Sequence, residues 1–158
     1  MAPETDRIEF QLNEQPLEYS LVGSRMRLLM PGRQTNGAFC LFDVQKPPRG
    51  STPVHQHKRE EETIYMLEGE MKAIVDGEEH LLVSGNTIIL PRNVPHQLLD
   101  CGDGTARYIL VCTPAGFDDF VAAAGRPWGD SSKGDDPADN EIVRLLEAAP
   151  KYGIEIIG

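Results

Sequence analysis

Residues 53–69 read PVHQHKREEETIYMLEG and contain two of the four histidines of the chain. These two histidines are separated by one residue, so on a β-strand both side chains leave the same face, with Cα atoms roughly 6.6 Å apart. Imidazole nitrogens bind divalent metals, and a nearby carboxylate can complete a mixed nitrogen and oxygen site. The sequence therefore predicts a metal site that contains His55 and His57. Three glutamates follow within the same stretch as candidates for the carboxylate ligand: Glu60, Glu61 and Glu62.

The spacing of this stretch resembles the first motif of the cupin family. That motif has a Gly, a His-x-His pair, a Glu after three or four further residues and a Gly six residues later. Gly50 precedes the histidine pair here, and four residues separate His57 from Glu62. Six residues separate Glu62 from Gly69, as the motif requires. Glu61 is one residue farther from Gly69 than the motif allows. The resemblance therefore implies Glu62 as the ligand, and the choice matters because a one-residue slip turns a strand side chain to the other sheet face.

The stretch GNTIILPRNVPHQLLD, residues 85–100, resembles the second cupin motif. Gly85, Pro91 and His96 stand at the motif positions, and the resemblance implies His96 as a further ligand. Asn93 replaces the usual Gly, and Asn tolerates the left-handed backbone conformation that this turn would need. Asp100 replaces the closing Asn, which is not a ligand in the family.

Together the motifs imply an antiparallel jelly-roll barrel, an all-β fold with the metal inside. One divalent transition metal ion per chain is expected, and iron, manganese, nickel, cobalt and zinc all suit three histidines and a glutamate. By alternation, Glu62, Ile64 and Met66 should share the interior face, as should His96 and Leu98. The fourth histidine, His80, lies outside both motifs and is predicted to be exposed to solvent. The implied metal ligands are His55, His57, Glu62 and His96.

Short apolar runs separated by Gly, Pro, Asn or Asp independently predict many short strands. Asp76-Gly77 is typical of a tight type I′ hairpin turn. The predicted strands cover residues 25–30, 39–44, 63–67, 70–75, 80–83, 87–90 and 107–113.

Two short C-terminal helices are predicted to close over the β domain. The first begins at Pro114 behind a Thr113 cap, carries Asp118 and Asp119 in its first turns, and ends at Gly125. The second begins at Pro137 and ends at Pro150, after a polar linker over residues 126–136. Its inward-facing residues are expected to be Ile142, Leu145 and Leu146.

The 158 residues support one domain, divided into an N-terminal arm (1–18), the barrel (19–113) and a C-terminal helical extension (114–158). The net charge is −10, and no stretch gathers the basic residues. The sequence therefore predicts no nucleic-acid partner and no attachment to an anionic membrane. Three widely spaced cysteines, Cys40, Cys101 and Cys112, are expected to be reduced, buried thiols of a cytoplasmic protein.

Two classes of function are open. The trailing helices also look similar to those of single-domain relatives of quercetin dioxygenase, which implies a dioxygenase-like oxidoreductase acting on an enol or phenol, with Glu62 as the catalytic base. A redox-silent metal could instead act as a Lewis acid in isomerisation or polyketide-type cyclisation. The alternative class is a metal-dependent module that binds or senses a small ligand without turnover. The expected partners are a small organic molecule and a second copy of the chain.

Overall fold

The computed structural model describes residues 12–129 and 141–158. Several expectations lie outside the described residues: most of the predicted arm, residues 130–136 of the predicted linker and the predicted start of the second helix at Pro137.

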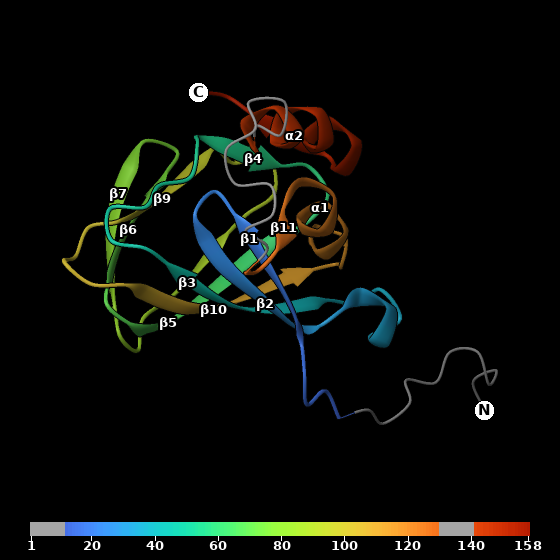
Figure 1. The fold of residues 1–158 in the computed structure, drawn as a ribbon. Helices are drawn as coiled ribbons and strands as arrows, with labels where there is room; N and C mark the ends of the chain where they lie inside the picture. Colours follow the sequence, from blue (N-terminus) through green and yellow to red (C-terminus); the bar gives the residue numbers. More distant parts are fainter. Residues whose placement is uncertain (1–11, 130–140) are drawn as a thin grey trace, which may run out of the picture.

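Two antiparallel sheets form the body of the protein and confirm the predicted jelly roll (Figure 1). The described strands of sheet A, in spatial order, are β11 (Arg126–Pro127), β1 (Leu17–Leu21), β2 (Ser24–Met30), β3 (Cys40–Lys46), β10 (Ala106–Thr113), β5 (Glu61–Glu68) and β8 (Thr87–Leu90). Those of sheet B are β12 (Ile154–Ile156), β4 (His55–His57), β9 (His96–Asp100), β6 (Glu70–Val75) and β7 (Glu78–Val83).

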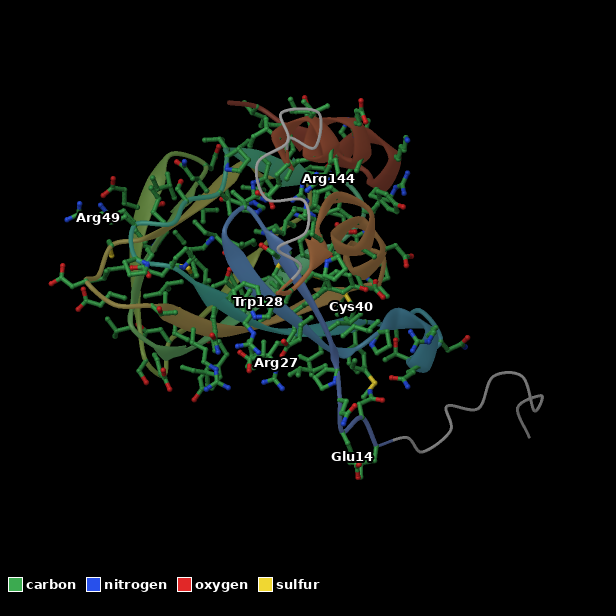
Figure 2. The ribbon with its side chains drawn as sticks, in the orientation of Figure 1. Glu14, Arg27, Cys40, Arg49, Trp128 and Arg144 are labelled. Carbon is green, nitrogen blue, oxygen red and sulfur yellow. The ribbon has the colours of Figure 1, made fainter. Side chains whose placement is uncertain are left out.

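Period-two alternation places the core between the sheets. Ile64 and Met66 of β5 in sheet A are fully buried, as predicted. Leu98 of β9 in sheet B is buried as well. The Asp76-Gly77 hairpin between β6 and β7 has positive φ at both residues, 50° and 81°, as a type I′ turn requires. Charged side chains such as Glu14 and Arg49 point outward, whereas Cys40 is buried (Figure 2). Cys112 is also buried, but Cys101 is exposed, so the expectation of three buried thiols is wrong for Cys101.

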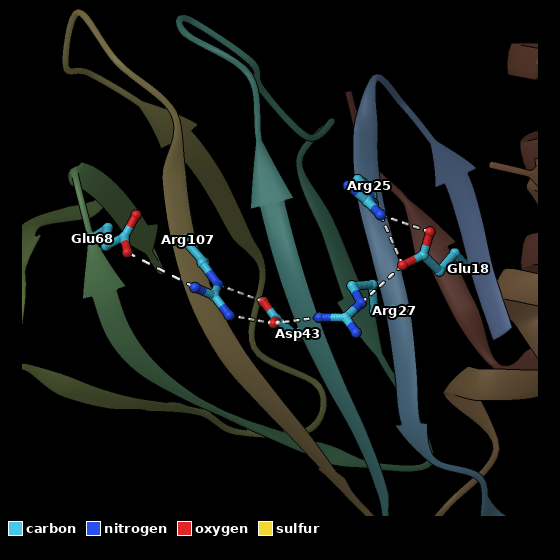
Figure 3. A network of polar contacts seen from close by, with 6 residues as sticks. All are labelled: Glu18, Arg25, Arg27, Asp43, Glu68 and Arg107. Atoms are coloured by element: carbon cyan, nitrogen blue, oxygen red, sulfur yellow. Dashed lines mark hydrogen bonds and ion pairs between the residues drawn. The ribbon is translucent and has the colours of Figure 1, made fainter. Parts of the chain in front are cut away.

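A chain of ion pairs crosses the outer face of sheet A (Figure 3). Its centre is Asp43, which is only 3% exposed because the arginines of the two neighbouring strands lie over it. Apart from Asp43, the charged side chains of this row are partly exposed, and such ion pairs each contribute little stability. From β5 to β1 the chain of pairs comprises Glu68, Arg107, Asp43, Arg27, Glu18 and Arg25.

The first C-terminal helix, α1 (Phe117–Ala124), begins three residues later than predicted. Thr113 does not cap it because β10 continues through Thr113, which pairs with Glu61 of β5. The helix ends at Gly125 as expected, and its Asp118 carboxylate accepts hydrogen bonds from the backbone N–H groups of Gly32 and Gly116.

The second helix, α2 (Glu141–Ala148), is followed by a 3₁₀ helix (Ala149–Tyr152) that leads into β12. Leu145 is buried as predicted, but Ile142 and Leu146 are 52% and 50% exposed, so their inward assignment is wrong. The helix buries only a narrow stripe that contains Leu145 and Ala148. Ile142 and Leu146 lie outside this stripe. Within the described ranges, no helix has both the length and the apolar character needed to span a membrane.

Candidate metal centre

The structure brings His55, His57, Glu62 and His96 together in one cluster, although they come from three strands of two different sheets. The histidines lie on β4 and β9 of sheet B, where His55 and His96 are directly opposite each other. Glu62 reaches them from β5 of sheet A. The cluster therefore lies between the two sheets, and Glu62 is the described carboxylate that completes it.

The four side chains approach closely enough to share an ion. Glu62 Oε2 lies 3.0 Å from His96 Nε2 and 3.4 Å from His57 Nε2. One ligand atom from each residue lies within 4.8 Å of all the others. Donors bound at about 2.1 Å to one ion are at most about 4.2 Å apart, so occupancy requires the widest pair to close by about half an ångström.

The outer nitrogen of each histidine ring is already engaged. Nδ1 of His55 lies 2.7 Å from the carbonyl oxygen of Pro53, and Nδ1 of His96 lies 3.1 Å from that of Val94. A carbonyl oxygen can only accept, so both Nδ1 atoms carry the proton. With the proton on Nδ1, the lone pair available to a metal is the one on Nε2, the atom that faces the cluster.

Buried polar atoms at the centre of the cluster lack hydrogen-bond partners among the described residues. They are His57 Nε2, His96 Nε2 and Glu62 Oε2, whose mutual approach does not have hydrogen-bond geometry. Buried polar atoms are normally satisfied, and leaving them unpaired is costly. A divalent cation would satisfy all three at once, so the residues present fit a metal ion.

The electrostatics of the cluster also suit a cation. Burial against neighbouring rings lowers the pKa of His55 to about 4, which keeps its imidazole neutral. Burial alone would raise the pKa of Glu62, but the three surrounding histidines outweigh it and lower this pKa to about 2. The pKa of His57 is raised because Glu62 and Glu60 together overcome the effect of burial. The site therefore offers an ionised carboxylate, Glu62, beside a neutral imidazole, His55.

The turn that delivers His96 follows the predicted geometry. Asn93 has a φ of 65°, the left-handed conformation expected where the family motif has Gly. The second motif thus has the same backbone shape despite the different residue.

A small cavity of about 70 Å³ lies against the rings of His55 and His57. Its walls include Phe117 and Phe120 of α1, Leu145 of α2 and Ile154 of β12, so the C-terminal segments cover the site with apolar side chains. A larger cleft of about 510 Å³ lies elsewhere, beside α1 and the turn that follows β2, and contains none of the four cluster residues.

The other sequence candidates have different positions. Glu61 points outward and binds Arg92 through two hydrogen bonds of 2.8 and 2.6 Å. Glu60 is buried against His57 rather than in the cluster, a position that no spacing signal in the sequence indicated. His80 lies on β7 opposite Ala73, outside the cluster, but it is half-buried rather than exposed as predicted.

The comparisons with known proteins agree with this architecture. A family model described as "Cupin domain" matches residues 42–112, which include all four cluster residues. Residues 42–112 form a cupin domain. A solved structure of an RmlC-like cupin from Shewanella frigidimarina superposes with a TM-score of 0.58 at 22% identity, over 70% of this chain and 94% of that one. This likeness shows the fold.

Two curated relatives share part of the cupin sequence. Quercetin 2,3-dioxygenase of Bacillus subtilis is 29% identical over 110 residues, which are 68% of this chain and 32% of that enzyme. The HTH-type transcriptional regulator PuuR of Escherichia coli is 27% identical over 114 residues, 71% of this chain and 60% of the regulator. This cupin thus spans about a third of one relative and less than two thirds of the other.

Proposed function

We propose that this cupin is a metal-dependent, dioxygenase-like oxidoreductase that acts on a small enol or phenol. The observation that carries the proposal is the convergence of histidine Nε2 atoms and the Glu62 carboxylate beside a cavity with apolar walls. The similarity to quercetin 2,3-dioxygenase supports this choice of chemistry.

The divalent ion would supply Lewis-acid and redox chemistry at positions that the four protein ligands leave open. The rings of His55 and His96, each oriented through Nδ1, would hold it. Glu62 is the catalytic residue in this proposal: its carboxylate would take the proton of the substrate hydroxyl.

The apolar walls would bind the carbon skeleton of the substrate and exclude water. A small-molecule pocket is typically about 300–1,000 Å³, far more than the 70 Å³ found here. A ring-sized substrate therefore requires the covering side chains, such as Phe120 and Leu145, to move outward on binding.

A second candidate function is a metal-dependent binding or sensing module without turnover. The similarity to the regulator PuuR favours it. The same site would then hold a small organic ligand, and Glu62 would act only as a metal ligand. Isomerisation or cyclisation at a redox-silent metal is the alternative within the enzyme class.

The test begins with metal analysis of protein purified without chelators. Dioxygen consumption is then measured for metal-loaded protein with a panel of enols and phenols. We expect uptake that depends on both metal and substrate and is absent from His96→Ala. Ligand binding without dioxygen uptake or product would favour the sensing module, and a product formed without dioxygen would favour isomerisation.

The homodimer and the cytoplasmic location stay predictions. Light scattering coupled to gel filtration tests the homodimer.

A further inference from the structure

The His57 ring lies between two carboxylates. Its Nε2 faces Glu62 Oε2 at 3.4 Å, and on the opposite side its Nδ1 lies 2.6 Å from Glu60 Oε1. Glu60 stands in the turn between β4 and β5, three residues after His57. One side of the ring therefore faces the cluster, and the other faces a second anion.

This arrangement distinguishes His57 from its two neighbours. His55 and His96 each use Nδ1 to contact a neutral backbone carbonyl two residues earlier in the chain, at 2.7 and 3.1 Å. His57 contacts a charged group at a shorter distance. Charge-assisted hydrogen bonds are shorter and roughly twice as strong as neutral ones. Of the three rings, His57 is therefore held most firmly. Its Nε2 is also the strongest electron donor to a bound metal ion.

The surroundings of Glu60 indicate what balances its charge. The residue is only 2% exposed. Among residues 12–129 and 141–158, no lysine or arginine forms an ion pair with it, and the nearby Arg92 pairs with Glu61 instead. Its described side-chain partner is the His57 ring, so positive charge on or beyond that ring would offset the cost of burying the carboxylate. A divalent ion at His57 Nε2 would give two positive charges to match the two carboxylates, Glu60 and Glu62.

We infer that Glu60 is a positioning residue of the metal centre, which orients His57 and neutralises the bound divalent cation through the imidazole ring. The inference rests on the metal site of the proposed function and deepens it. Glu60 does not touch the ion or a substrate. It fixes the proton on His57 Nδ1 and so keeps the Nε2 lone pair directed at the cluster.

The test compares three variants with the wild type. Glu60→Gln has the same shape and an oxygen that can still accept from Nδ1, but it has no charge. Glu60→Ala removes the acceptor as well. Glu61→Gln is the matched control, because Glu61 is the adjacent residue and pairs with Arg92 on the surface. Zinc affinity is measured by competition with a chromophoric chelator, and the Nδ1–H proton signals of ¹⁵N-histidine-labelled, zinc-loaded protein are recorded by NMR.

We expect zinc affinity to fall by about 10-fold in Glu60→Gln and by up to about 100-fold in Glu60→Ala, the usual range for such partners, while Glu61→Gln matches the wild type. The His57 Nδ1–H signal should shift in Glu60→Gln while those of His55 and His96 stay in place. Equal affinities and an unmoved signal in Glu60→Gln would overturn the role of Glu60 and leave the metal site intact. Failure of the wild type to bind any divalent metal would overturn both this inference and the proposed function.

Discussion

The backbone N–H of Asn93 donates a 2.7 Å hydrogen bond to the carbonyl oxygen of His57. This bond joins the turn of the second motif directly to the strand of the first. Because His96 follows Asn93 by three residues, the bond sets the distance between two of the cluster histidines. Asn93 itself has the left-handed conformation, with φ at 65°.

Replacing Asn93 should separate backbone shape from side-chain chemistry. Glycine adopts positive φ without strain, so Asn93→Gly should leave stability and metal affinity almost unchanged. Asn93→Val should lower the free energy of unfolding by about 1–3 kcal/mol and weaken metal binding, because a β-branched residue is strained there. Urea unfolding and metal titration check both effects. A valine variant with unchanged stability would mean that the turn does not need this conformation.

Metal content should depend on the clustered histidines and not on the fourth one. His57→Ala should lose most of its metal, because it removes one of four donors and leaves Glu60 and Glu62 buried around a gap. His80→Ala is the control, since His80 lies on β7 outside the cluster. Metal is quantified by mass spectrometry after gel filtration. Equal metal content in the wild type and His57→Ala would refute the assignment of the site.

Lys46 predicts a pH dependence of stability that is independent of the metal. It is only 2% exposed, its Nζ lies 3.4 Å from Ser24 Oγ, and burial lowers its pKa to about 8 despite the nearby Asp100. The folded state therefore binds this proton less tightly than the unfolded state, whose pKa is 10.5. The buried charge of Lys46 therefore lowers the free energy of unfolding, by about 3 kcal/mol at neutral pH. This effect is fully present below pH 8 and disappears as the pH rises toward 10.5.

The variant Lys46→Met removes the buried charge, so it should be more stable than the wild type at pH 7. The difference should narrow by about 1 kcal/mol between pH 7 and pH 9, as the wild-type lysine loses its proton. Urea unfolding at each pH measures it, and Lys58→Met, which removes an exposed lysine, is the matched control. A difference that stays constant over this range would show that Lys46 keeps its charge in the folded protein.

Glu62→Gln should distinguish catalysis from binding. The amide still offers an oxygen to a metal but is a very poor base. For an enzyme of the proposed type, the variant should retain part of its metal and substrate affinity while turnover falls by about 10²–10⁴-fold, the usual contribution of a general base. Single-turnover kinetics on samples matched for metal content measure this, with Glu61→Gln as control. Near-equal rates per bound metal would leave Glu62 as a ligand alone.

Features that depend on neighbours along the chain could be predicted from residue types alone. Alternation put His55 and His57 on one face of a strand and Ile64 and Met66 in the interior. Apolar runs bounded by turn residues located β6 and β8 at their observed bounds. Turn chemistry determined the positive φ of Asp76 and Asn93. In each case the cause is steric and lies within a few residues, so it can be read directly from residue types.

How distant segments meet could not be predicted from residue types and needed the folded structure. The spacing resemblance selected Glu62, but that Glu62 lies on sheet A and faces histidines of sheet B follows from the pairing of β5 with β10 and β8. The burial of Glu60 against His57 and the exposure of Ile142 and Leu146 also depend on which surfaces pack together. The physical reason is that strand alternation and helix periodicity define the faces of an element, whereas the partner of each face is selected by packing between segments far apart in the chain.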